Sequence, residues 1–231
     1  MNVISGTAVV LGATGGIGSA MADALEAGGQ YQNVLRFSRS SQPAFNLTDE
    51  ASIAACAAAA GQAGNVRLVF DATGFLHDEA TAPEKALRQL TPAAMEKNFR
   101  LNAMGPALVM KHFLPLLPRE GRSVFATLSA RVGSISDNSL GGWHSYRASK
   151  AALNQFVRCA AIELKRTHKE AVCIGLHPGT VQSDLSAPFA KSGLNVRPPE
   201  QAAEDLLRVI GSLGPPQSGR QFAYDGSEVP A

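Results

Sequence analysis

Tyr146 and Lys150 are the residues whose types and spacing in this chain are best suited to proton transfer. Four residues apart on a helix, their side chains share one face and can reach one bound molecule. Free tyrosine has a pKa near ~10, which is too high for efficient proton transfer at neutral pH. A nearby lysine cation favours the phenolate and lowers that pKa. The pair predicts a tuned acid/base, while a surface Tyr beside a solvated Lys is the alternative that this spacing alone leaves open.

A glycine-rich turn follows the first predicted strand, residues 7–11. Gly12, Gly16 and Gly18 stand in this turn, and an apolar stripe then predicts a helix over residues 16–28. Glycines permit a tight turn and a close approach of backbone to a pyrophosphate, and a helix N-terminus offers free N–H groups. A glycine turn alone is often only a loop. Between a strand and a helix, it predicts a nucleotide-binding site.

Length and composition set the remaining limits. With 231 residues, we expect one α/β domain over residues 1–231 and little room for a second. The net charge of +2 gives no argument for nucleic acid or an anionic membrane as a partner. Cys56, Cys159 and Cys173 share no metal-ligand spacing, so we expect no metal site and reduced thiols in a cytoplasmic protein. No signal peptide is visible, and the Ala-rich run 51–60 is too short to span a bilayer.

Strands and helices alternate along the predicted chain. We expect strands at 7–11, 33–38, 43–46, 66–71, 122–128, 171–176 and 220–224. We expect helices at 16–28, 49–60, 92–117, 145–167 and 199–211. This order predicts a Rossmann-type, doubly wound parallel sheet of about seven strands with helices on both faces. In such sheets, ligands bind at the carboxyl ends of the strands.

Four motifs together resemble the short-chain dehydrogenase/reductase family over essentially the whole chain. They are the turn Gly12, Gly16 and Gly18; Tyr146 with Lys150; Asn102 within a helix; and Pro178-Gly179 after a late strand. Their order and spacing are more specific than any one of them. The segments 129–137, 141–144 and 224–226 look like the C-factor-like branch of carbonyl-reductase relatives.

The resemblance implies hydride transfer between a nicotinamide and a carbonyl carbon. Tyr146 would protonate the carbonyl oxygen on reduction, and Lys150 would lower its pKa and hydrogen-bond the nicotinamide ribose. Asn102 would hold a water that links Lys150 to solvent. The family's Ser-Ser pair aligns with Ser129 and an alanine, although the second member is the usual catalytic one. Ser129 is the nearest hydroxyl, with Ser134 as the alternative.

The resemblance also implies the cofactor contacts. No acidic residue follows the second strand, and Arg39 can hold a 2′-phosphate, so we expect NADP(H) to be preferred, with NAD(H) possible. A solvated strand-end charge is the alternative for Arg39. Asp71-Ala-Thr-Gly74 stands where the family usually has Asn-Asn-Ala-Gly. Of the first and last residues of this segment, we expect Gly74, more than Asp71, to lie beside the cofactor. The expected cofactor-binding residues are Gly12, Thr14, Gly15, Gly16, Ile17, Gly18, Arg39, Asn46, Leu47, Ala72, Thr73, Gly74, Tyr146, Lys150, Pro178, Gly179, Thr180 and Val181.

We therefore expect an NADPH-dependent oxidoreductase that reduces a small-molecule aldehyde or ketone. A cofactor-binding sensor or signalling protein of the same fold, with little turnover, is the alternative. Epimerases and dehydratases of this fold carry a larger substrate domain, for which 231 residues leave no space. Residues 183–199 are either a substrate-covering segment or a plain surface loop.

The resemblance further implies assembly through two long helices. Apolar residues on 92–117 and 145–167 exceed what one face against a sheet needs. Because the family pairs these helices across a two-fold axis, we expect a homodimer or homotetramer. The alternative is that the excess apolar surface packs within one chain.

Overall fold

One seven-stranded sheet organises this computed structural model, which describes residues 4–183 and 196–231. The strand order is β2-β1-β3-β4-β5-β6-β7. The strands are β1 (Ile4–Leu11), β2 (Tyr31–Phe37), β3 (Val66–Asp71), β4 (Ser123–Leu128), β5 (Ala171–His177), β6 (Gln221–Ala223) and β7 (Glu228–Val229). The first six are parallel, and β7 runs antiparallel to β6. The expected Rossmann-type α/β fold is confirmed.

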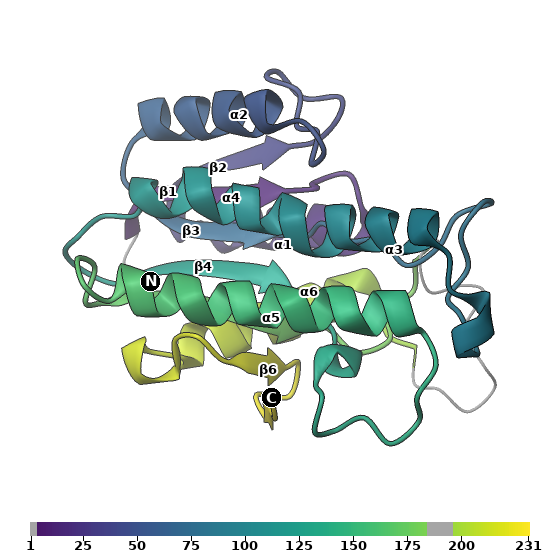
Figure 1. The fold of residues 1–231 in the computed structure, drawn as a ribbon. Helices are drawn as coiled ribbons and strands as arrows, with labels where there is room; N and C mark the ends of the chain where they lie inside the picture. Colours follow the sequence, from purple (N-terminus) through teal and green to yellow (C-terminus); the bar gives the residue numbers. More distant parts are fainter. Residues whose placement is uncertain (1–3, 184–195) are drawn as a thin grey trace.

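Helices cover both faces of the sheet (Figure 1). The α-helices are α1 (Gly16–Gly28), α2 (Glu50–Ala63), α3 (Pro92–Phe99), α4 (Gly105–Phe113), α5 (His144–Leu164) and α6 (Pro199–Ser212). Side chains of α1 and α6 pack on one face, and those of α2, α4 and α5 on the other. Shorter helical turns are η1 (Leu87–Gln89), η3 (Leu114–Leu116), η4 (Arg131–Gly133) and η6 (Pro215–Gln217).

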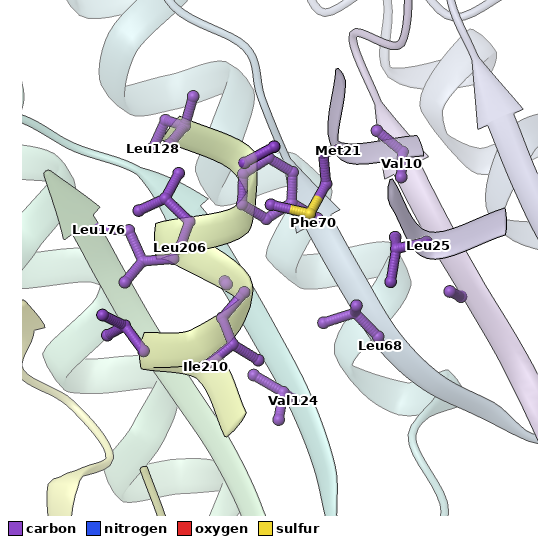
Figure 2. Packing of buried hydrophobic residues seen from close by; sticks show 14 of the residues in the cluster. Val10, Met21, Leu25, Leu68, Phe70, Val124, Leu128, Leu176, Leu206 and Ile210 are labelled. Atoms are coloured by element: carbon purple, nitrogen blue, oxygen red, sulfur yellow. The ribbon is translucent and has the colours of Figure 1, made fainter. Parts of the chain in front are cut away.

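The core on the α1–α6 face fixes the strands in register (Figure 2). Met21 and Leu25 of α1 and Leu206 of α6 are at most 3% exposed, and they pack over the strand residues. Full burial of such a side chain stabilises the fold by about 1.5–3 kcal/mol each. Because β1 to β6 run parallel, their carboxyl ends lie along one edge of the sheet.

That edge contains the topological switch point. Strand β1, second from the edge of the sheet, pairs with the edge strand β2 on one side and with β3 on the other. The chain therefore leaves β1 toward one side and leaves β3 toward the other, which opens a crevice at their carboxyl ends. The glycine turn follows β1, and Asp71–Gly74 follow β3, so both expected cofactor segments border the crevice.

The long helix expected over 92–117 is interrupted. Between α3 and α4, residues Arg100–Met104 (η2) form one wide helical turn in which the N–H of Gly105 donates to the carbonyl of Arg100, five residues back. Pro106 explains the interruption, because it has no N–H to donate to the carbonyl of Asn102. Wide turns of this kind are frequent at functional sites.

Two strand expectations also differ from the structure. Residues 43–46 form no strand: Pro43 lacks an N–H, and Phe45 is buried with its N–H donating to the carbonyl of Ser38. A two-residue strand, β7, was missed; it follows the turn at Asp225-Gly226. Most of the expected substrate-covering segment 183–199 lies outside the described residues.

Candidate active site

Lys150, Asn102 and Gly74 meet at the switch-point edge. A Cβ added to Gly74 would lie 3.6 Å from Lys150 Nζ and 3.8 Å from Asn102 Oδ1. Lys150 is 3% exposed, and its amine donates to the carbonyl of Leu128, at the end of β4, at 2.9 Å. The structure thus brings three residues far apart in the sequence into direct proximity. A Cβ at position 74 would be in ordinary contact with both side chains, so the glycine leaves the space beside the amine open without being sterically required.

Asn102 is buried and links the segment after β3 to α5 through its side-chain amide. Its amide nitrogen donates to the carbonyl of Phe75, and its oxygen accepts from the N–H of Phe75, both at 2.8 Å. The same nitrogen lies 3.2 Å from Ser149 Oγ on α5. The wide turn η2 therefore ties the segment after β3 to the helix that carries Tyr146 and Lys150. Asn102 is completely buried, so its amide does not face solvent on the helix surface.

Tyr146 stands one helical turn before Lys150 on α5. Its ring packs edge-on to Trp143, with ring centroids 6.1 Å apart. Burial raises the pKa of Tyr146 to about 12, and Lys150 does not lower it. The expectation of a lowered tyrosine pKa is therefore wrong for this structure, because desolvation of the phenolate outweighs the field of a lysine held against Leu128. At neutral pH, Tyr146 keeps its proton and can donate it.

Asp71 is the electrostatic partner of Lys150. Burial lowers the pKa of Lys150 to about 8, and the charge of Asp71 opposes this shift. Asp71 is fully buried at the end of β3, where Thr73 N–H, Thr73 Oγ1 and Thr127 Oγ1 donate to its carboxylate at 2.6–3.0 Å. Burial raises the pKa of Asp71, while these donors and Lys150 lower it. The departure from the family's Asn thus places a negative charge near the site amine.

The serine assignments are not supported by the geometry. Ser129 is 4% exposed, and its hydroxyl donates to Asn154 Oδ1 at 2.7 Å. Asn154 lies eight residues beyond Tyr146 on α5, about 12 Å along the helix axis. Ser134 is 2% exposed and accepts from the N–H of Asp137 at 3.1 Å. Both hydroxyls are engaged in holding the strand end and the following loop.

Glu84 and Ser145, which the sequence did not indicate as site residues, hold the start of α5. The backbone N–H of Trp143 donates to the Glu84 carbonyl, and the Ser145 N–H donates to the Glu84 carboxylate at 3.1 Å. Although burial raises the pKa of Glu84, hydrogen bonds from Ser145 bring it below its usual range. Trp143 has a φ of 52°, a left-handed conformation that is costly for a large residue. Because Glu84 lies about 60 residues from α5, no local pattern signals this cap.

The glycine turn after β1 fits a pyrophosphate group. Gly12 has a φ of 76°, and a Cβ on Gly18 would collide with the Gly12 carbonyl oxygen. Thr14, Gly15 and Gly16 are exposed, and no side chain caps the N-terminus of α1. No acidic residue stands in its first turn either. A compact turn with uncapped N–H groups is what a nicotinamide dinucleotide needs from the protein.

Arg39 lies beside that turn. The N–H groups of Gly12 and Ala13 both donate to the carbonyl of Phe37, which brings the end of β2 against the glycine turn. Arg39 follows two residues later and is exposed. Arg36 is instead engaged with Asp23 and Glu26 of α1, each at 2.7 Å. Arg39 is therefore an exposed cation near this strand end that could hold a phosphate group.

The other expected cofactor residues surround the same edge. Leu47 packs where a Gly105 side chain would stand, and Asn46 Oδ1 accepts from the N–H of Thr48 at 3.1 Å. Ala72 and Thr73 follow β3, and Ile17 stands in the first turn of α1. Pro178, Gly179, Thr180 and Val181 follow β5, where Arg197 N–H donates to the Thr180 carbonyl. These segments all follow the carboxyl ends of strands, so they lie along one edge of the sheet.

Comparison with known proteins assigns the family. Residues 6–192 match the short chain dehydrogenase family, and the chain belongs to that family of NAD(P)-dependent oxidoreductases. It is 39% identical to the C-signal protein of Myxococcus xanthus over 145 residues, 63% of this chain and 83% of that protein. The expected C-factor-like resemblance is confirmed.

Further relatives include enzymes and solved structures. The chain is 33% identical to 1-hydroxy-2-glutathionyl-2-methyl-3-butene dehydrogenase of Rhodococcus sp. over 192 residues, 80% of this chain and 78% of that one. An NADPH-bound carbonyl reductase from chicken fatty liver superposes with a TM-score of 0.83 at 23% identity, with full coverage of both chains. The carbonyl reductase Sniffer of D. melanogaster gives 0.84 at 20% identity, covering 99% and 100%. At these identities, the structures establish the fold alone.

Proposed function

We propose that this protein reduces the carbonyl group of a small aldehyde, ketone or quinone with NADPH, and that Tyr146 donates the proton. The observation that carries the proposal is the meeting of Lys150, Asn102 and Gly74 one helical turn from Tyr146, at the switch-point edge. When bound, the cofactor supplies a hydride to the carbonyl carbon. The raised pKa of Tyr146 keeps its hydroxyl protonated at neutral pH, so the proton that reduction consumes is present.

Each site residue has a separate task in this proposal. The Tyr146 hydroxyl has no hydrogen-bond partner within residues 4–183 and 196–231, so it is available to the substrate oxygen. The Lys150 amine, which is buried at the end of β4, would hold the ribose of the nicotinamide. Asn102 keeps the segment after β3 against α5, and in this proposal it would hold a water that relays protons to Lys150.

A preference for NADPH over NADH belongs to the same proposal. Arg39 is exposed near the glycine turn, whereas the Arg36 guanidinium forms an ion pair with Asp23 of α1. A guanidinium can pair with a 2′-phosphate in a bidentate manner. The structural neighbour from chicken liver holds NADPH, which supports this choice.

A sensor or signalling role with little turnover is the second candidate. It is favoured by Ser129, whose hydroxyl is committed to Asn154, and by the absence of a hydroxyl on the following residue, Ala130. The similarity to C-signal supports the same reading. The two candidates share the fold and the cofactor-binding residues and differ only in the rate of chemistry.

Turnover on a panel of aldehydes, ketones and quinones distinguishes these candidates. The reductase proposal predicts NADPH oxidation that requires the carbonyl compound and saturates with it. NADPH binding without measurable oxidation on any member of the panel would favour the sensor. The single domain over residues 1–231 and the cytoplasmic location remain predictions. No helix within the described residues is long and apolar enough to cross a membrane.

We also propose that the chain assembles through the outer faces of α3, α4 and α5. Met104, in η2 between α3 and α4, is 56% exposed, and Phe156 of α5 is 43% exposed. A groove lined by Leu47, Met95, Phe99 and Leu108 runs beside Met104. Large exposed apolar side chains gathered on one face favour a contact between copies.

A further inference from the structure

His177, the last residue of β5, carries a buried polar atom that the architecture leaves unused. Its Nδ1 is buried and has no hydrogen-bond partner in the part of the chain that the structure describes. Buried polar atoms are paired in the great majority of cases, so an orphaned nitrogen requires an explanation.

The imidazole lies on the same face of the sheet as Tyr146 and Lys150. Successive side chains of a strand point to opposite faces. On β5, Ile174 and Leu176 pack into the core on the α1–α6 face, whereas Cys173 packs on the α5 face. By this alternation, His177 points to the α5 face.

His177 also stands beside the strand end that anchors Lys150. Leu128 of β4 pairs with Leu176 of β5, and the Ser129 N–H donates to the Leu176 carbonyl at 2.8 Å. Neighbouring strands are about 4.8 Å apart, so His177 lies within one strand spacing of Ser129. The Lys150 amine is bound to the carbonyl of Leu128, next to this pair.

The charge state of His177 suits an uncharged hydrogen-bond donor. Burial, together with the charges of Arg131 and Arg197, lowers the pKa of His177 to about 4, against the opposing charges of Asp225 and Asp137. At neutral pH, the ring therefore carries one N–H and one lone pair. The nearby serine hydroxyls are committed: Ser129 to Asn154, and Ser134 to the loop after β4.

We propose that the half-buried His177 imidazole donates a hydrogen bond through Nε2 to the carbonyl oxygen of the substrate, as a second donor beside the Tyr146 hydroxyl, while the inaccessible Nδ1 keeps the lone pair. This inference rests on the proposed reductase function. A bound reduced nicotinamide would supply hydride to the carbonyl carbon; the π-electron pair would then move to the oxygen, which would take the proton of Tyr146. His177 stabilises the charge that develops on this oxygen and gives up no proton.

Two substitutions with a matched control test the assignment. His177→Phe removes the donor, His177→Asn keeps a neutral N–H donor, and His168→Asn alters a histidine after the far end of α5. With NADPH and either 4-nitrobenzaldehyde or menadione, His177→Phe should lower kcat about 10²- to 10³-fold. Because His177→Asn keeps a neutral N–H donor, its kcat should stay within about tenfold of the unmutated kcat. His168→Asn should leave kcat unchanged, and all three should bind NADPH as tightly as the unmutated protein does.

A second measurement needs no turnover. In ¹⁵N NMR of the NADP⁺ complex, adding 4-nitrobenzyl alcohol should shift the ring nitrogens of His177 and not those of His168. This result also decides the matter if His177→Phe does not fold.

The inference is overturned if His177→Phe keeps its kcat, if NADPH affinity falls with kcat, or if the His177 nitrogens do not respond. Loss of turnover in Tyr146→Phe but not in His177→Phe removes this inference and leaves the proposed function standing. If the unmutated protein reduces no carbonyl compound, both fall.

Discussion

A lysine amine can remain charged inside a protein only where nearby groups replace its water. Lys150 has the carbonyl of Leu128 at 2.9 Å and the charge of Asp71, yet burial still lowers its pKa to about 8. Asp71 is in turn held by Thr73 and Thr127. The protonation of the site amine thus depends on a carboxylate that belongs to a different strand.

Asp71→Asn should therefore shift the pH dependence of reduction. Loss of the carboxylate removes the interaction that raises the pKa of Lys150, so that pKa falls below about 8. Reduction should decline as Lys150 loses its proton with rising pH, and this decline should move to lower pH in the variant. Measurement of kcat/KM from pH 6 to 10 checks it; coincident profiles for both proteins would contradict the electrostatic link.

Arg39→Ala should reduce the preference for NADPH over NADH. The loss should be roughly 1.5–3 kcal/mol, the scale of a hydrogen bond to a charged group. Arg36→Ala is the control, because its guanidinium is engaged by α1. Dissociation constants for both cofactors measure the effect. Equal affinities in the unmutated protein, or an equal loss in both variants, would rule out the role of Arg39.

At the scale of elements, α5 must start in a fixed position for Tyr146 to reach the switch-point edge. Its first turn has no side-chain cap of its own, and Trp143 precedes it in a left-handed conformation. Glu84, from the segment after β3, accepts from both the N–H and the hydroxyl of Ser145. The position of the site helix is therefore set by a contact distant in sequence.

Glu84→Ala should lower the free energy of unfolding by about 1.5–3 kcal/mol, because it leaves buried donors at the start of α5 unpaired. Glu79→Ala, at an exposed position of the same segment, is the control. Urea unfolding measures both. A loss no larger than that of Glu79→Ala would show that Glu84 does not hold the helix.

The element pattern was largely predictable from the sequence, because apolar periodicity and the glycine turn are local signals. The helix containing Asn102 was expected to be continuous, although Pro106 removes the donor that an uninterrupted helix needs. Contacts made by distant residues were not predictable: Ser129 with Asn154, Asp71 with Lys150, and Glu84 with Ser145. The tyrosine pKa was mispredicted because burial depends on the whole packing, and not on a four-residue spacing.

At the scale of the whole molecule, part of the apolar excess on the two long helical segments packs internally. Val109, Phe113, Leu153 and Val157 are at most 1% exposed, so they belong to the core and not to an interface. Met104 and Phe156 remain exposed. The proposed contact between copies is therefore narrower than the sequence suggested.

Met104→Glu combined with Phe156→Glu should dissociate the assembly, because charges in an apolar contact lose their hydration. Light scattering should give a multiple of 24.1 kDa for the unmutated protein and 24.1 kDa for the double variant. Leu140→Glu, at a position 89% exposed outside these helices, should not alter the mass. An unmutated monomer at micromolar concentration, or an assembly that survives the double substitution, would contradict this interface.

The central claim, that this chain uses Tyr146 to protonate a carbonyl oxygen, is tested most directly by Tyr146→Phe. The substitution removes one hydroxyl and keeps the ring that packs against Trp143. Loss of a general acid should lower kcat on the order of 10²- to 10⁴-fold, while the NADPH dissociation constant stays within about twofold. A variant that reduces carbonyl compounds at nearly the unmutated rate would contradict the account.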